Sequence, residues 1–249
     1  MAIAAISVVS HGHGEMLDHV LRDLENQTVH DHLLVIVTLN LEDEIFDPSR
    51  YPGLRISVIK NSSPRGFGAN HNSAFAQCHT EWFFILNPDV RLPCATAIAD
   101  LIHKAGNTAG LMSPRIMNSS GGWEDAVRPN LSLSSLMARV LVGRRESLLA
   151  TVTRKGMPFF WVAGMFMVVR SEVFRKIGGF DHRYFLYCED YDLCARIYLA
   201  GHEIMVRDDV QVIHDAQRDS HRSSRHLRWH LESLLKVWSS SAFWRVVFS

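Results

Sequence analysis

The chain has 249 residues, of which 47% are hydrophobic, so it is long enough for one large α/β domain or for one domain with a small appendage. Its 26 basic residues balance its 26 acidic residues, which argues against a general nucleic-acid-binding protein because such proteins are usually basic. The four cysteines form no C-x-x-C pair, so a zinc knuckle is not expected and free thiols in a reducing cytosol are favoured.

The first part of the chain alternates predicted strands with predicted helices. Short apolar runs rich in β-branched or aromatic residues predict strands at residues 3–9, 33–39, 54–59 and 82–86. Apolar residues at helical spacing predict helices at residues 17–24 and 69–77. The alternation predicts a doubly wound, mostly parallel sheet with helices on both faces. The first run lacks the basic flank of a signal peptide, and no apolar run reaches the roughly 18 residues of a membrane span.

The second part is less regular. Residues 118–132 have the composition of a loop, residues 159–169 are apolar again, and residues 170–181 predict a short helix that ends in a Gly-Gly turn. The tail after Gln217 is polar at first and then has a helical pattern. Its apolar face would comprise Leu227, Leu231, Leu234, Leu235 and Trp238. We therefore expect one domain over residues 1–216 and a C-terminal helical extension over residues 217–249.

Polar side chains follow three of the predicted strands. Ser10 and His11 follow the first, Asn40 follows the second, and Asn87 and Asp89 follow the fourth. In doubly wound sheets the ligand lies at the carboxyl ends of the strands, so these residues would converge on one site. The proline between Asn87 and Asp89 restricts the backbone that presents the carboxylate.

Several of these residues have a functional and a structural interpretation. Asp89 could bind a hard cation such as Mg²⁺ or Mn²⁺ when a diphosphate supplies other oxygens, but Asn-Pro-Asp also favours an Asx turn. His214, after a strand-like run, could join a metal site or bind phosphate, but a lone histidine is often structural. The segment from Arg65 through Gly66 to Asn70 could place N–H groups and a guanidinium near phosphates, although it lacks the P-loop lysine and the dinucleotide spacing.

Three acids in four residues, Glu189, Asp190 and Asp192, precede another helical pattern. Acids at a helix start are favoured by the helix dipole alone. One of them could instead act as a general base on a hydroxyl group. Arg196, further along the same pattern, could pair with the acids or neutralise a phosphate.

Taken together and in order, these segments resemble family 2 glycosyltransferases, especially the bacterial rhamnosyltransferase-like branch that builds surface polysaccharides. The matching segments are ISVVSHGHGEMLDHVLRDLENQ, NSSPRGFGANHNSAF, WFFILNPDVRL, WVAGMFMVVRSEVFRKIGGFDHRYFLYCEDYDLCARIYLAGHEI and VIHD. The resemblance implies a GT-A fold and inverting transfer from a nucleotide-diphospho sugar to a hydroxyl of a growing surface glycan, such as O-antigen, lipopolysaccharide or capsule. Rhamnose from dTDP-rhamnose is the first expectation for the donor.

The resemblance also implies roles for individual residues. Asp89 occupies the metal-binding position of the family's D-x-D motif and would bind Mg²⁺ or Mn²⁺ on the diphosphate, with His214 completing the metal shell. Asp190 matches the catalytic base. The donor side would comprise Ser10, His11, Asn40, Arg65, Gly66, Asn70 and Asn87. The sugar and acceptor cleft would comprise Trp161, Gly164, Glu189 and Arg196.

The sequence departs from the family at the second strand, where Leu39 stands in place of the aspartate that commonly contacts the nucleotide base. The donor nucleotide is therefore open. Arginines beside the C-terminal leucines favour an anionic membrane surface and a lipid-linked acceptor on the cytoplasmic leaflet, but the leucines could equally pack on the domain. These arginines are Arg218, Arg222, Arg225 and Arg228, and either of the first two could instead reach the diphosphate.

Two other functions are compatible with a doubly wound nucleotide-binding domain. A sugar-nucleotide pyrophosphorylase would need a glycine-rich segment with Arg or Lys after the first strand, which SHGHGEM does not supply. A non-catalytic binding module would be favoured if the Glu-Asp pair or the metal aspartate were missing, and both are present. The expected protein is thus a cytoplasmic enzyme that binds no nucleic acid.

Overall fold

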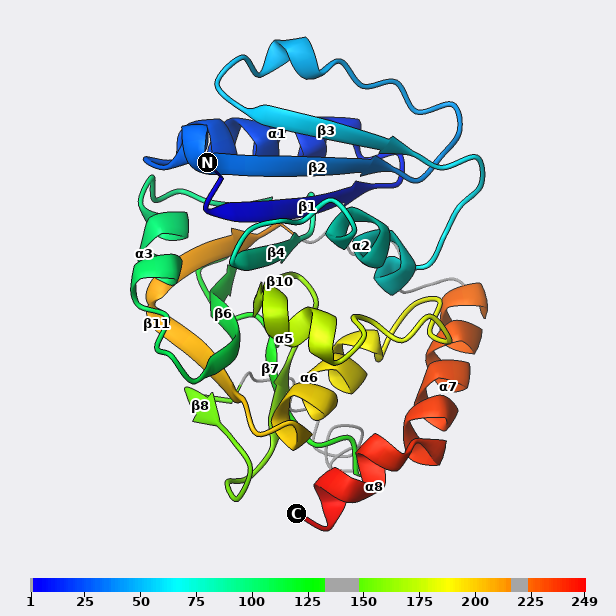
Figure 1. The fold of residues 1–249 in the computed structure, drawn as a ribbon. Coiled ribbons are helices and arrows are strands. Elements are labelled where there is room, and N and C mark those ends of the chain that lie inside the picture. The colour runs from blue at the N-terminus through cyan, green and yellow to red at the C-terminus, as the bar shows by residue number, and fades with distance from the viewer. Residues whose placement is uncertain (1, 133–147, 216–223) are drawn as a thin grey trace.

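The computed structural model describes residues 2–132, 148–215 and 224–249. Arg218 and Arg222 lie outside these residues. The described part of the chain is built around one large, curled sheet with helices on both faces (Figure 1). This arrangement agrees with the doubly wound, mostly parallel sheet that the sequence predicts and with the GT-A fold that the resemblance implies.

The strand order of the large sheet is β3-β2-β1-β4-β10-β6-β11-β5, and β8 pairs with β11. Its first four strands in space are β3 (Arg55–Lys60), β2 (Leu33–Leu39), β1 (Ala4–Ser10) and β4 (Trp82–Leu86), and they are parallel. The others are β10 (Phe166–Arg170), β6 (Ala109–Asn118), β11 (Glu203–His214), β5 (Val90–Arg91) and β8 (Val152–Thr153). Strand β10 is antiparallel to both of its neighbours, whereas β11 is parallel to β6.

The register of the parallel strands brings their carboxyl ends together. Val8 of β1 pairs with Val37 of β2 and with Leu86 of β4. The polar residues that follow these strands therefore emerge along one edge of the sheet, as predicted for a ligand site.

Alternating side chains of the strands divide between two cores. In β4, Trp82 and Phe84 face the core under α1 (Gly14–Glu25) and α3 (Ala97–His103), while Phe83 and Ile85 face the other core. That second core is covered by α2 (Phe67–Phe75), α5 (Ser171–Lys176), α6 (Glu189–Leu199) and the C-terminal helices. Two 3₁₀ turns, η1 (His30–His32) and η2 (Pro48–Arg50), complete the first half.

The expectation that residues 118–132 form a loop is wrong in part. Strand β7 (Val127–Pro129) lies inside this segment and pairs with β9 (Phe160–Val162), and Met117 forms a bridge with Trp123. The partner of β7 lies more than 30 residues away in the sequence. Local composition carries no information about such a distant partner, so the strand was not predictable from it.

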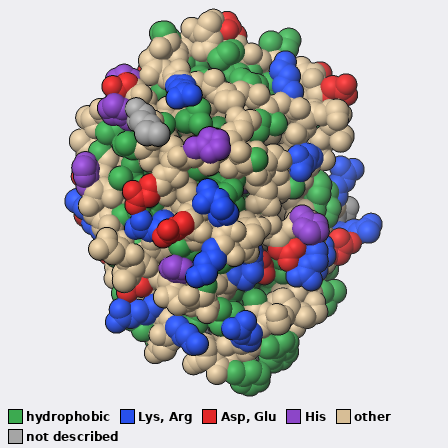
Figure 2. Space-filling view, viewed as in Figure 1, with side chains coloured by type: hydrophobic (Ala, Val, Ile, Leu, Met, Phe, Trp, Pro, Cys, Tyr) green, Lys and Arg blue, Asp and Glu red, His purple; other side chains and the backbone are tan. Residues whose placement is uncertain are grey.

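The C-terminal residues form α7 (Ser224–Ser239) and α8 (Ser241–Val247), joined at a sharp corner (Figure 1). Val237, Phe243 and Val246 are buried in the second core, so these helices are anchored to the domain. The predicted apolar face of α7 is divided, because Leu234 and Trp238 pack on that core while the other three leucines are exposed. Hydrophobic side chains are also visible at the lower end of the molecule, where α8 ends (Figure 2). Among the described residues, no helix combines the length and apolar composition that crossing a bilayer requires.

Candidate active site

A network of buried amides fixes the edge of the sheet beyond β2 and β3. The side-chain oxygen Oδ1 of Asn40 accepts hydrogen bonds from Asn61 Nδ2 and from the Arg65 backbone N–H, both at 2.8 Å. Asn61 Nδ2 also donates to Asn70 Oδ1 at 2.7 Å, and Asn70 Nδ2 donates to the Arg65 carbonyl at 3.1 Å. The network therefore holds the segment from Asn61 to the start of α2 against the sheet. Asn61, which follows β3, was not among the predicted site residues, although its place after a strand was the available signal.

The turn after β1 carries a second polar group. The Ser10 hydroxyl donates to the Glu44 carboxylate, and the Gly12 N–H donates to the same carboxylate at 3.3 Å. His11 is exposed and accepts a hydrogen bond from Asn40 Nδ2 at 3.1 Å, which joins this turn to the amide network. Glu44 was not predicted, because it belongs to the irregular segment between β2 and β3 and has no motif of its own.

Asp89 and His214 come from opposite ends of the sequence and meet through strand pairing. β5 pairs with β11 so that Val90 lies beside His214, and His214 Nε2 then lies 3.2 Å from Asp89 Oδ2. Burial lowers the pKa of His214, but the Asp89 hydrogen bond and charge, with help from Glu124, outweigh it and raise the pKa overall. The Glu124 carboxylate is 3.8 Å from the Nδ1 atom of the same ring.

These two residues fit a divalent cation that a diphosphate would share. Asp89 Oδ1 is buried and has no hydrogen-bond partner, which is a costly state for a carboxylate oxygen unless something binds it. Carboxylate and imidazole are both ligands that Mn²⁺ accepts, and Mg²⁺ accepts the carboxylate. Within the described residues no cluster of three or more His, Cys, Asp or Glu side chains could hold a metal, so the remaining ligands would have to come from phosphate or water.

Glu189, Asp190 and Asp192 lie in the first turn of α6. Asp190 Oδ2 accepts the Gly164 N–H at 3.0 Å, and Asp190 Oδ1 accepts the Tyr191 N–H at 2.8 Å. Burial raises the pKa of Asp190, and the opposing effects of Arg128 and the backbone N–H groups offset this only in part. Glu189 is buried, its Oε2 atom has no hydrogen-bond partner, and burial together with the Asp190 charge raises its pKa well above the ordinary range. Asp190, whose side chain is half-buried and whose pKa is raised, is suited to accept a proton.

Two adjacent residues join the Asp190 carboxylate to the Asn-Pro-Asp turn. Gly164 holds Asp190 through its N–H, and the carbonyl oxygen of Met165 accepts the Asn87 N–H at 3.0 Å. The predicted base and the predicted metal ligand therefore flank the start of β10. Gly164 also lies close to Phe67, where an added Cβ would approach the ring to 3.1 Å.

The backbone just before α6 is held in an unusual conformation. Tyr187 and Cys188 have φ values of 73° and 64°, which are uncommon for residues other than glycine. The inner face of α7 contacts this segment: the Tyr187 hydroxyl lies 2.7 Å from His226 Nδ1, and Ser233 Oγ donates to the Leu186 carbonyl at 2.9 Å. Because such conformations persist only where the surroundings hold them, α7 positions the segment that presents Asp190.

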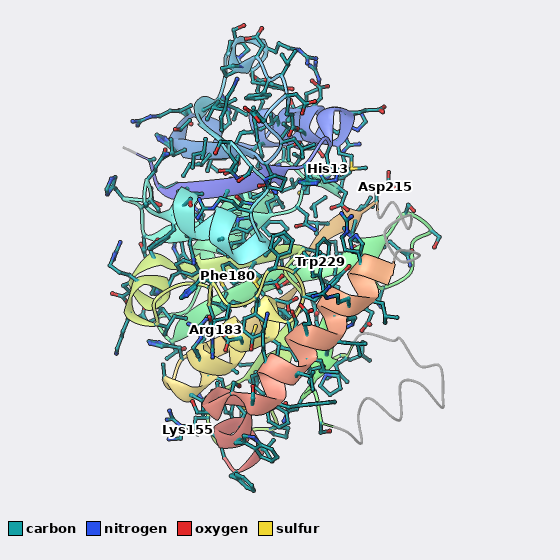
Figure 3. All side chains as sticks on the ribbon, turned by 90° about the vertical axis from the view of Figure 1, so that its right-hand side faces the viewer. His13, Lys155, Phe180, Arg183, Asp215 and Trp229 are labelled. Atoms are coloured by element: carbon teal, nitrogen blue, oxygen red, sulfur yellow. The ribbon has the colours of Figure 1, made fainter. Side chains whose placement is uncertain are left out.

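Residues 66 and 67, at the start of α2, also contact the segment before α6. The Phe67 N–H donates to the Phe185 carbonyl at 2.9 Å, and an added Cβ on Gly66 would come within 2.4 Å of that same oxygen. Gly66 is thus needed for a close backbone approach. The exposed Phe185 ring packs against Trp229 of α7 with ring centroids 5.0 Å apart. Figure 3 shows Trp229 on α7 below His13, which precedes α1, and Asp215, which directly follows β11.

For three predicted residues, the contacts in the described structure involve neither Asp89 nor Asp190. Trp161 is buried, and its ring lies under the Arg128 guanidinium and against Tyr191. The Arg65 guanidinium donates to Ser73 Oγ on α2. Arg196 pairs with Asp192 at 2.7 Å, donates to the Ile177 carbonyl and lines a separate hollow of about 500 Å³. Arg128, on β7, is the cation that acts on Asp190, and no motif in the sequence pointed to it.

Comparison with known proteins identifies the family of this chain. The profile of the family described as "Glycosyltransferase like family 2" matches residues 3–231. The chain is 28% identical to the rhamnosyltransferase WbbL of Escherichia coli (strain K12) over 250 residues, which covers 93% of this chain and 90% of that protein. It is 27% identical to the N-acetylglucosaminyl-diphospho-decaprenol L-rhamnosyltransferase of Mycobacterium tuberculosis (strain ATCC 25618 / H37Rv), covering 79% of this chain and 71% of that protein.

Solved structures with similar folds are more distant in sequence. A mannosyltransferase from Pyrobaculum calidifontis, solved with GDP-Man and Mn²⁺, superposes with a TM-score of 0.63 at 17% identity, covering 94% of this chain and 64% of that chain. GalNAc-T7, solved with UDP, GalNAc and Mn²⁺, gives a TM-score of 0.64 at 14% identity, covering 97% of this chain and 49% of that chain. This chain therefore spans less than two thirds of either solved chain, and at these identities the likeness concerns the fold. Because the family profile covers most of the sequence, the chain belongs to glycosyltransferase family 2.

Proposed function

We propose that this glycosyltransferase transfers a sugar, with inversion and with the help of a divalent cation, from a nucleotide-diphospho sugar to a hydroxyl of a growing surface glycan. The observation that carries the proposal is the pairing of Asp190 and Asn87 with the adjacent residues Gly164 and Met165. It brings a half-buried carboxylate of raised pKa close to the Asn-Pro-Asp turn. One site can therefore combine a proton acceptor with a diphosphate-binding edge.

In the proposed reaction, Asp190 accepts the proton of the acceptor hydroxyl while that oxygen attacks the anomeric carbon of the donor sugar. The new C–O bond forms as the bond to the diphosphate breaks, and the nucleoside diphosphate leaves with its electron pair. A single displacement with one base inverts the anomeric configuration. A divalent cation held by Asp89 and His214 would neutralise negative charge on the diphosphate.

The protein's own residues have two tasks in this reaction. The amide network of Asn40, Asn61 and Asn70 fixes the loop that borders the donor, so little ordering is left for the moment of binding. The Gly164 and Tyr191 N–H groups orient both oxygens of the Asp190 carboxylate. We assign residues 1–216 to the transferase domain and residues 217–249 to a helical extension.

The relatives suggest which sugar and acceptor to test first. Two are named as rhamnosyltransferases, and one of these acts, by its name, on an N-acetylglucosaminyl-diphospho-decaprenol. We therefore propose rhamnose from dTDP-rhamnose as the donor and a lipid-linked glycan as the acceptor, used by a cytoplasmic enzyme at the inner face of the membrane.

A thermal-shift panel tests the donor site directly. Nucleoside diphosphates and their sugar conjugates are added with and without Mn²⁺, since a ligand that binds only the folded state raises the melting temperature. We expect a Mn²⁺-dependent rise with dTDP-rhamnose that Asp89→Ala removes. A panel in which no nucleotide raises the melting temperature, with or without Mn²⁺, would contradict the proposed donor site.

A further inference from the structure

Exposed hydrophobic side chains are concentrated on the two C-terminal helices. Six of the eleven large hydrophobic side chains that are exposed in the described structure lie in the last 26 residues. On α7, Leu227, Leu231 and Leu235 are 62%, 55% and 63% exposed, and their spacing of four residues places them on one stripe. At the end of α8, Trp244, Val247 and Phe248 are 49%, 41% and 81% exposed. We call these six residues the outer face.

The outer face is not explained by the packing of the domain. The opposite side of α7 supplies the contacts that anchor it, including buried Val237 and Ser233 and the hydrogen bond between His226 and the Tyr187 hydroxyl. On α8, the Trp244 indole N–H donates to the Trp238 carbonyl at 2.8 Å, so its polar atom is satisfied while half of the side chain remains exposed. An exposed apolar stripe on one helix, with a second exposed apolar group that includes a tryptophan on the next, is typical of an interaction surface.

The positive charge of these helices favours an anionic partner. Residues 224–249 contain four basic residues, Arg225, Arg228, Lys236 and Arg245, and a single acidic residue, Glu232, whereas the whole chain is neutral. Arg225, Arg228 and Arg245 are exposed. The single acid forms an exposed pair with Arg228, an interaction that contributes little in water and leaves the excess of positive charge in place. Figure 2 shows Lys and Arg side chains gathered over the lower half of the face it views.

We propose that the outer face of α7 and α8 docks this enzyme on an anionic lipid bilayer. Leucines and aromatic rings would enter the boundary between headgroups and acyl chains, and the flanking basic side chains would meet the lipid phosphates. A second copy of the chain fits this face less well, because a symmetric contact would bring the basic residues of both copies together. The proposal rests on the proposed function for its lipid-linked acceptor, but the docking itself involves no nucleotide sugar.

The placement of α7 gives this docking a consequence for catalysis. Its inner face contacts residues 185–187, which lead directly to Glu189 and Asp190. An enzyme docked through the outer face would therefore present the base-bearing segment near the membrane surface, where a lipid-linked acceptor extends its sugar.

Vesicle sedimentation of the full chain tests the proposal without donor or acceptor. We expect binding to vesicles of phosphatidylglycerol and phosphatidylethanolamine, weaker binding to phosphatidylcholine vesicles, and a loss of binding as salt is raised. The double variant Leu231→Ser/Leu235→Ser should lower the vesicle–water partition coefficient by about tenfold or more, because it removes two apolar side chains that the bilayer would bury. Ile45→Ser, which removes an even more exposed apolar side chain from the segment between β2 and β3, should not change the partition coefficient.

A charge variant and the state of association complete the test. Arg225→Glu/Arg228→Glu should remove the preference for anionic vesicles and leave the melting temperature almost unchanged. Wild-type protein that fails to bind anionic vesicles, or a leucine variant that binds them as well as wild type, would overturn the proposal. So would a concentration-dependent dimer that the leucine variant abolishes. If vesicle binding persists while no sugar is transferred to any acceptor, the proposed function fails and the docking surface stands.

Discussion

The proposed donor edge and the segment that carries the proposed base, Asp190, are held in place by different means. At the donor edge, Asn40, Asn61 and Asn70 form hydrogen bonds with one another and with the Arg65 backbone. Beside the proposed base Asp190, Glu189 leaves a buried carboxylate oxygen unpaired, and Tyr187 and Cys188 adopt left-handed backbone conformations. The donor edge is rigid because its polar groups are satisfied. Burial raises the pKa of the proposed base, Asp190, and helix α7 contacts the segment that precedes it.

Of these two regions, the proposed base Asp190 is expected to contribute mainly to turnover. Asp190→Asn should lower kcat by about 10²–10⁴-fold, because an amide cannot accept the acceptor proton, while leaving the donor-induced thermal shift unchanged. Steady-state kinetics with dTDP-rhamnose and the thermal-shift assay measure the two effects. Turnover close to wild type would remove Asp190 from the role of base.

The donor edge should respond through stability and donor binding instead. Asn61→Ala removes the amide that donates to both Asn40 and Asn70, which leaves two buried carbonyl oxygens short of a donor. We expect a loss of about 1–3 kcal/mol in the free energy of unfolding and a higher KM for the donor. Urea denaturation measures the first effect. Asn107→Ala, at an exposed site, is the matched control and should change stability by less than about 0.5 kcal/mol. Equal effects of the two variants would contradict a structural role for the network.

The contact of α7 with the base-bearing segment should affect turnover more than donor binding. His226→Phe keeps an aromatic ring beside Tyr187 but removes the hydrogen bond to its hydroxyl. We expect kcat to fall by about tenfold with the donor KM unchanged, because a displaced Asp190 carboxylate would slow the reaction. Tyr187→Phe and the double variant complete a double-mutant cycle. If the two single effects simply add, the hydrogen bond does not position the base.

The smallest expected effect concerns stability and pH at Glu189. Its pKa is raised by burial, so the folded state binds this proton more tightly than the unfolded state does, and ionisation destabilises the fold as pH rises. Glu189→Gln should therefore stabilise the protein by about 1 kcal/mol at about pH 8.5 and by much less at about pH 5. Melting temperatures across this range measure the difference, and the exposed Glu42→Gln should show none. A gain that does not depend on pH would mean that Glu189 is not the titrating group.

Local patterns in the sequence were sufficient for the four parallel strands β1 to β4. The strands at residues 33–39 and 82–86 were predicted with their observed bounds, and β1 and β3 differ from prediction by one residue at each end. These strands are short apolar runs bounded by turn residues, a signal that is contained in adjacent residues. The convergence of Ser10, Asn40 and Asp89 at one edge followed from the parallel alternation, because the carboxyl ends of such strands coincide.

Pairings between distant residues were not accessible in this way. The strand at Val127–Pro129, the proximity of Arg128 to Asp190 and the contact of His226 with Tyr187 each join segments more than 30 residues apart. The sequence predicted a helix after residue 217 but not which of its leucines would be buried, since that depends on the surface against which the helix packs. Periodicity and turn chemistry thus determined the fold class, the edge of the sheet that carries the site and the types of its residues. Tertiary packing decided which side chains meet, because burial and hydrogen bonding depend on neighbours that the local sequence does not contain.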